Sequence, residues 1–158
     1  MAAMGAQAGL QCMSRQEIEA AFPNLSNSGY SITSPATAEY NCIAWASGDT
    51  GAWWWPDPMN LYYWPSEIPR ENTLEAFIKA YELSGYVICN DSNYEEGFGK
   101  IAIYVNDDKK PTHAARQLSS GRWTSKLGNL EDIEHTTLGG LRSLVYGTIA
   151  VFMKRPGK

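Results

Sequence analysis

The sequence predicts an α+β fold in which N-terminal helices, one of them bearing a cysteine, pack on a C-terminal antiparallel sheet. Helix-start signals and helical apolar spacing occupy the first half of the chain, whereas after residue 99 apolar residues recur at every second position between turn residues. The 158 residues suit one domain with a sizeable core. We expect that domain over residues 14–158, behind a flexible Ala/Gly/Gln-rich tail at residues 1–13.

The first helix is indicated by a capping box, Ser14-Arg-Gln-Glu17, in which a hydroxyl and a carboxylate satisfy two free backbone amides. This motif predicts a helix from about Arg15 to Phe22, and Pro23 stops it. The following segment, Asn24 to Pro35, is rich in Ser, Asn and Thr, so we expect a loop there.

The second helix is short, built largely of small residues, and carries Cys42 in its first turn before Gly48 ends it. A helix N-terminus stabilises a thiolate and offers backbone N–H groups to an oxyanion, so this placement favours a nucleophile. The alternative is a buried core thiol, because free cysteine behaves as a small hydrophobe. A cap at Thr33 or Ser34 would start the helix earlier and weaken the dipole effect on Cys42.

A long aromatic segment, Asp49 to Arg70, follows this helix. Its prolines forbid a long helix, and its six aromatic residues between Trp53 and Trp64 indicate an ordered loop. The rings either form a satellite core over the Cys42 helix or wall a substrate groove. We expect core for most of them and assign substrate contact to Trp54.

The remaining elements are two helices and five strands. A capping signal at Asn72 and an apolar stripe predict a helix that ends at Gly85. We expect a short helix capped by Asn129 between the last two strands. The predicted strands are Tyr86 to Cys89, Lys100 to Val105, Thr112 to Leu118, Arg122 to Leu127 and Thr148 to Met153.

Two histidines are available as a base for Cys42. His113 opens a central strand, where a histidine is well placed to meet a cysteine on a packed helix. His135 is expected at a helix end and is given a structural role. His113 is therefore the predicted general base.

A third group usually orients such a base, and the sequence leaves its identity open. A two-residue hairpin loop at Ser120-Gly121 would put Lys126 on the face of His113, whereas a three-residue loop would put Ser125 there. Ser125 could accept a hydrogen bond from the imidazole, and Lys126 could stabilise an oxyanion, as could Asn41. Asp132 is a further candidate.

Composition excludes several classes of function. The net charge of −4 and the lack of a basic stripe argue against general binding of nucleic acid or anionic membranes. Three irregularly spaced cysteines offer neither a disulfide framework nor a metal knuckle, so we expect no metal and no cofactor. With no signal peptide or membrane-spanning run, we expect a cytoplasmic protein, and export without a signal remains open.

The order of these motifs resembles the papain-like superfamily in its reduced bacterial form, the NlpC-like cysteine hydrolases. More closely, the chain resembles an uncharacterised bacterial family over about residues 14–155. The segments that carry this resemblance are Tyr40-Asn-Cys-Ile-Ala-Trp-Ala46, Trp53-Trp-Trp-Pro56, Thr112-His-Ala-Ala-Arg-Gln117 and Trp123-Thr-Ser-Lys-Leu-Gly128.

The resemblance implies a Cys42–His113 pair. The chain departs from the NlpC-like pattern at Asn41, where that family favours Asp, at Ile43-Ala44, where it has Ser-Gly, and in lacking its second histidine on the neighbouring strand.

The leading hypothesis is a thiol hydrolase or transferase of amidase, peptidase or deamidase type that acts on a peptide, amide or thioester substrate. One alternative is a non-catalytic module that binds a ligand or protein through the aromatic loop. Another is a toxin or effector domain.

Overall fold

The computed structural model describes residues 15–127 and 131–157, and it has an α+β architecture built on one seven-stranded sheet. The strand order is β1-β6-β5-β4-β3-β7-β2, and every neighbouring pair is antiparallel. The strands are β1 (Tyr30–Ser34), β2 (Val87–Cys89), β3 (Phe98–Val105), β4 (Pro111–Gln117), β5 (Trp123–Lys126), β6 (Asp132–His135) and β7 (Thr148–Pro156).

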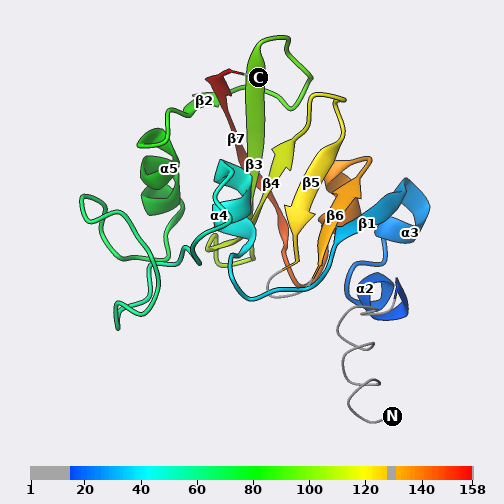
Figure 1. The fold of residues 1–158 in the computed structure, drawn as a ribbon, viewed down its shortest axis with the longest axis horizontal. Coiled ribbons are helices and arrows are strands. Elements are labelled where there is room, and N and C mark those ends of the chain that lie inside the picture. Colours follow the sequence, from blue (N-terminus) through cyan, green and yellow to red (C-terminus); the bar gives the residue numbers. More distant parts are fainter. Residues whose placement is uncertain (1–14, 128–130, 158) are drawn as a thin grey trace.

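Helices cover both faces of this sheet (Figure 1). The elements are α2 (Arg15–Ala21), α3 (Leu25–Ser28), α4 (Cys42–Ser47), α5 (Leu74–Glu82) and a 3₁₀ helix, η1 (Leu138–Leu141). Residues of α4 and α5 share a core with one sheet face, whereas α2, α3 and η1 share a core with the other. We call these the α4 face and the α2 face.

Neighbouring residues of one strand belong to different cores, as the pleat of a strand requires. On β4, Ala114 packs in the core of the α4 face, while Ala115 packs in that of the α2 face. On β3, Ile103 and Tyr104 divide in the same way. This alternation decides which side chains can meet the helix that bears Cys42.

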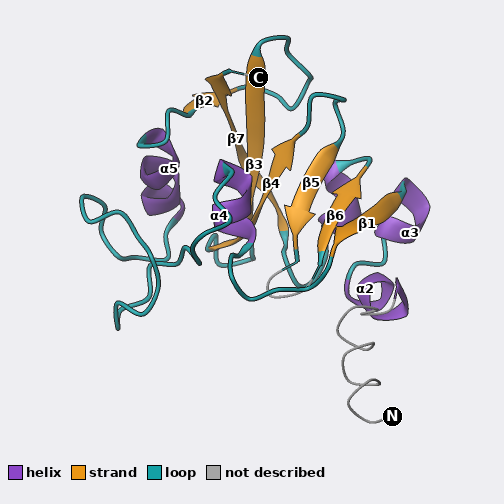
Figure 2. Ribbon diagram, viewed as in Figure 1, coloured by secondary structure: helices purple, strands orange, loops and turns teal. Residues whose placement is uncertain are grey.

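The long loop between α4 and α5 has no helix or strand and extends at the lower left of the view (Figure 2). As the sequence predicts, this loop contributes to the core, because Trp54 and Trp64 are buried in the cluster that includes α4. Arg70 joins two parts of this loop by donating to the carbonyl oxygens of Asp57 and Tyr62 at 2.7 and 2.6 Å. The loop is thus fixed from both sides.

Three predicted elements differ from the structure. Asn24 to Pro35 contains α3 and β1 in place of a continuous loop, so Thr33 and Ser34 lie in or at the end of a strand and do not cap the Cys42 helix. The helix that starts near Asn72 is capped by Thr73, whose hydroxyl accepts from Ala76 N.

The segment predicted as a short helix before Arg142 instead contains β6 and η1. The sequence Asp-Ile-Glu-His alternates polar and apolar residues, and pairing on both sides, with β1 and β5, stabilises it as a strand. His135 therefore lies on a central strand and not at a helix end. The expected cap residues Ser14 and Asn129, and the N-terminal tail, lie outside the described residues.

Among the described residues, no helix combines the length and the apolar character that crossing a bilayer requires.

Candidate active site

Asn41 fixes the start of α4 and so the position of Cys42. Its side-chain oxygen accepts from Ala44 N and from Trp54 N, each at 3.1 Å, and its amide donates to Trp54 O at 2.7 Å. Gly48 ends the helix in the left-handed region, with φ of 91°. Cys42 is thus the first helical residue, as the sequence predicts, whereas the Asn41 side chain is bonded to the helix and the loop rather than left free for an oxyanion.

Cys42 is almost completely buried, with 5% of its surface exposed. Burial raises the pKa of its thiol to about 11, although backbone hydrogen bonding by Ala114, Ile43 and Cys42 itself and the charge of Lys126 act in the opposite direction. The expected lowering of this pKa by the helix N-terminus is therefore outweighed by desolvation. In the resting protein Cys42 is a neutral thiol.

A groove of about 350 Å³ reaches Cys42. It is lined by Asn41, Cys42, Trp53, Trp55, Tyr62, Thr112 and Tyr146. Trp54, expected to contact substrate, is not among these residues: it packs 6.3 Å from the Tyr81 ring and donates through Nε1 to Asp49 at 2.8 Å. Its neighbours on either side, Trp53 and Trp55, line the groove instead.

Ser125 contacts His113, as one of the two predicted registers requires. Gln117 pairs with Trp123 and the backbone of Leu118 bonds to Arg122, so the hairpin loop has three residues. The Ser125 hydroxyl lies 3.0 Å from His113 Nε2 and 2.8 Å from His135 Nε2. This register is confirmed, and Lys126 consequently faces away from His113.

The structure does not bring His113 to Cys42. His113 pairs with Tyr104 across β3 and β4, stacks 4.0 Å from the Tyr146 ring, and so belongs to the α2 face. Cys42 lies on the α4 face, and among the described residues no hydrogen bond joins the two side chains. The prediction failed because strand parity, set by the register of β4, turns the imidazole to the other side of the sheet.

The two histidines and Ser125 form a chain of hydrogen bonds, and the carbonyl of Thr137 sets the direction of each bond. Thr137 O can only accept, so His135 Nδ1 donates to it at 2.9 Å and His135 Nε2 accepts from Ser125. Ser125 then accepts from His113 Nε2, which leaves Nδ1 of His113 as a buried acceptor with no partner among the described residues. Burial holds the pKa of His113 well below its usual range and lowers that of His135 to about 4, so both rings are neutral.

Lys126 lies on the α4 face of the sheet and interacts electrostatically with Cys42. It is completely buried, and its Nζ donates to Thr37 O at 2.6 Å and lies 5.2 Å from the centre of the Tyr40 ring. Burial lowers the pKa of Lys126 to about 8, while the charges of Asp132, Cys42 and Glu131 raise it. Lys126 and Cys42 thus perturb each other electrostatically.

Asp132 lies opposite Lys126 in the pairing of β5 with β6. Its Oδ2 accepts from the Tyr40 hydroxyl at 2.6 Å and from the Ser34 hydroxyl. The carboxylate is therefore held in place and compensates the ammonium of Lys126. No set of three or more His, Cys, Asp and Glu side chains suited to a metal ion occurs within residues 15–127 and 131–157.

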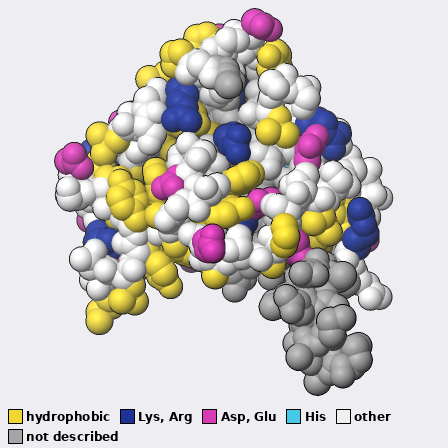
Figure 3. All heavy atoms as spheres, viewed as in Figure 1, with side chains coloured by type: hydrophobic (Ala, Val, Ile, Leu, Met, Phe, Trp, Pro, Cys, Tyr) yellow, Lys and Arg dark blue, Asp and Glu magenta, His cyan; other side chains and the backbone are white. Residues whose placement is uncertain are grey.

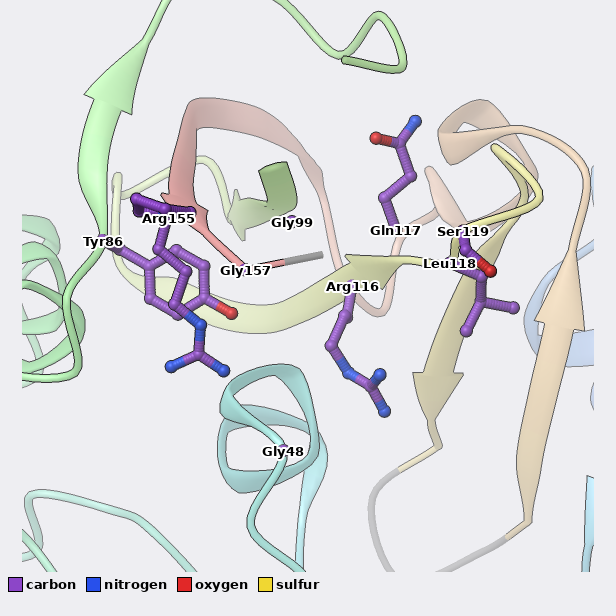
Figure 4. A pocket seen from close by; sticks show the side chains of 10 residues that line it. Gly48, Tyr86, Gly99, Arg116, Gln117, Leu118, Ser119, Arg155 and Gly157 are labelled. Atoms are coloured by element: carbon purple, nitrogen blue, oxygen red, sulfur yellow. The ribbon is translucent and has the colours of Figure 1, made fainter. Parts of the chain in front are cut away.

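A second hollow of about 320 Å³ lies at the other end of α4. In Figure 4 the side chains of Arg116 and Arg155 reach toward Gly48 from two sides. Arg116 donates to Trp45 O at 3.1 Å, and Arg155 donates to Ser84 O and Ser47 O at 2.9 and 3.1 Å. These guanidinium groups satisfy the last carbonyl groups of two helices, which is a structural task.

Residues 31–154 match the family described as Domain of unknown function (DUF7689). Comparison with curated proteins gave no match, and comparison with solved structures gave none.

Proposed function

Because the chain belongs to the DUF7689 family, whose description names no activity, we propose its function from the geometry of the site: a thiol hydrolase or transferase in which Cys42 is the nucleophile and Lys126 is the base. The observation that carries this proposal is the electrostatic interaction between Cys42 and Lys126. A helix-borne thiol at the floor of a groove lies within electrostatic reach of a buried amine whose pKa is about 8.

A lysine can act as a general base when burial brings its pKa near the working pH. In the proposed reaction the neutral amine of Lys126 takes the proton of the Cys42 thiol as the sulfur attacks a carbonyl carbon. The resulting ammonium then protonates the leaving amine or thiol, and water releases the acyl group from the sulfur. The Cys42 and Ile43 amides at the start of α4 supply hydrogen bonds for the oxyanion.

The helix-borne cysteine packed on an antiparallel sheet supports a papain-like arrangement for this fold. The proposed base differs from that of the NlpC-like hydrolases, since His113 lies on the other face of the sheet. A peptide, amide or thioester is the proposed substrate class.

The pH dependence of Cys42 alkylation tests this pair. We expect the rate with iodoacetamide, followed at Cys42 by mass spectrometry, to rise through about pH 8 as Lys126 loses its proton. In Lys126→Met that step should vanish, and the rate should rise only toward the thiol pKa of about 11. Lys126→Arg keeps the charge but cannot accept a proton, so it should also lose the step.

His113→Gln is the matched control, because it changes an equally buried group on the opposite face. It should keep the step near pH 8. A step that survives Lys126→Met and disappears in His113→Gln would instead identify the histidine as the base. A step that survives in both variants would mean that neither residue is the base, and a parent protein without a step near pH 8 would mean that Cys42 is an inert thiol.

The binding module is favoured by one observation, the 5% exposure of Cys42. A groove that only binds would need no reactive sulfur, so a Cys42→Ala protein would keep its ligand and the alkylation profile would show no step below the thiol pKa. The same assay thus separates the two functions.

A further inference from the structure

We infer that the groove at Cys42 accepts an aliphatic acyl chain, so that the substrate is an acyl ester or acyl thioester whose carbonyl meets the sulfur and whose chain lies between the aromatic rings. This inference rests on the proposed function and names its substrate class. Two features of the groove carry it: its aromatic, uncharged lining, and the internal hydrogen bonds that occupy Asn41 and Thr112.

The lining is aromatic and uncharged. Trp53 and Trp55 come from one part of the loop, Tyr62 from another, and Tyr146 from the segment before β7. No ionised side chain is among the lining residues. A charged group on the ligand would lose its hydration here without gaining a partner, which disfavours acidic and basic substrates.

The two polar lining residues other than the thiol and the tyrosines are already bonded within the protein. Asn41 is bonded to Ala44 and Trp54, and the Thr112 hydroxyl donates to Tyr146 O at 2.5 Å. A peptide would bring backbone N–H and C=O groups that need partners when buried. Asn41 and Thr112 are thus already engaged, and an aliphatic chain, which brings no such groups, needs no partner from them.

Apolar side chains close in sequence to two of the lining residues are exposed. Exposed aliphatic side chains flank the two segments that supply Tyr62 and Tyr146, namely Met59, Leu61, Leu144 and Val145. Hydrophobic side chains gather over the aromatic loop at the lower left of Figure 3. The groove at Cys42 thus belongs to a loop region with much exposed apolar surface.

The reaction balances without a further reagent. The Cys42 sulfur bonds to the acyl carbon, the bond from that carbon to the leaving oxygen or sulfur breaks, and the thiol proton passes through Lys126 to the leaving group. Water then adds to the acyl carbon, the carbon–sulfur bond breaks, and the fatty acid leaves while the thiol regains a proton.

Alkylation rates with three reagents test the inference: iodoacetamide, N-octyl iodoacetamide and iodoacetate. The ratio of the Cys42 rate to the Cys89 rate in the same molecule corrects for reagent reactivity. We expect this ratio to be about tenfold higher with the octyl reagent than with iodoacetamide. Complete burial would multiply the ratio roughly fourfold for each methylene, so a tenfold gain corresponds to partial burial of the chain. Iodoacetate should lower the ratio.

Tyr62→Ala opens the wall of the groove and should abolish the gain from the octyl chain. Tyr94→Ala is the matched control, since Tyr94 has a similar exposed fraction, 47% against 44%, but does not line the groove. An equal or lower ratio for the octyl reagent, or a gain that persists in Tyr62→Ala, overturns the acyl assignment.

This result is separable from the test of the proposed function. A ratio between reagents at one pH does not depend on which residue takes the thiol proton. The absence of a step near pH 8 in the parent protein would rule out the proposed enzyme but would leave the chain-length ratio to show what the groove accepts. Conversely, a step near pH 8 without a higher ratio for the octyl reagent would support the proposed enzyme and exclude an acyl substrate.

Discussion

Two buried polar groups flank the same strands, β4, β5 and β6, on opposite faces of the sheet. On the α2 face, His113, Ser125 and His135 are neutral and linked in one chain of hydrogen bonds. On the α4 face, Lys126 and Asp132 carry opposite charges beside a thiol that opens on a groove. The difference teaches that the histidines, which look catalytic in the sequence, do not line the groove at Cys42, whereas the lysine interacts electrostatically with the nucleophile.

The largest effect is expected from Asp132→Asn. This change keeps an acceptor for Tyr40 and Ser34 but removes the charge that compensates Lys126. In the described part of the chain no direct ion pair joins the two groups, so the loss should not exceed the cost of breaking a buried charge pair, about 3–5 kcal/mol. Urea unfolding near pH 7 should show this loss, and it should shrink at higher pH, where Lys126 is neutral.

Asp132→Asn should also lower the pKa of Lys126, since the charge of Asp132 raises it. The step in Cys42 alkylation should consequently move below about pH 8. An unchanged step would show that Lys126 does not control the reactivity of Cys42, and would break the contrast between the two faces.

The next largest effect is the loss of stability expected when His135 on the α2 face is protonated. The pKa of His135 falls from 6.5 to about 4 on folding, so the unfolded chain binds a proton between these values and the folded protein does not. Stability from this residue is therefore complete above about pH 6.5 and is lost as the pH falls toward 4, by about 3 kcal/mol in total. Unfolding by urea at several pH values measures this loss.

His135→Gln is the control for that titration, because glutamine hydrogen-bonds but does not ionise in this range. The difference in unfolding free energy between the two proteins should narrow as the pH falls. A difference that stays constant with pH would mean that His135 is protonated equally in both states.

The smallest effect is expected from Ser125→Ala. The change removes the hydroxyl that bridges two buried imidazoles, and leaving such groups without a partner costs about 1–3 kcal/mol. The alkylation profile of Cys42 should stay as in the parent protein, since Ser125 lies on the α2 face. A shifted profile would connect the two networks and return Ser125 to the catalytic role that the sequence suggests.

Local signals in the sequence determined the elements whose cause is local. The short helix at Cys42 was predictable because its small residues and Gly48 define it, and four of the late strands were predictable from their alternation. β6 was not predictable in this way, because a four-residue strand takes its stability from the neighbours on both sides, β1 and β5. The many large aromatic residues of the loop predict that some, such as Trp54 and Trp64, are buried. They do not predict which tryptophans face the groove.

By itself the sequence determined that Cys42 begins a helix and that Ser125 meets His113 if the hairpin loop has three residues. Only the tertiary structure decided that this loop has three residues, and that the β4 register turns His113 away from the helix while Lys126 on β5 turns toward it. The physical reason is the two-residue period of a strand: a shift of one residue moves a side chain to the opposite face. The register that fixes the choice depends on long-range pairing, which no local pattern encodes.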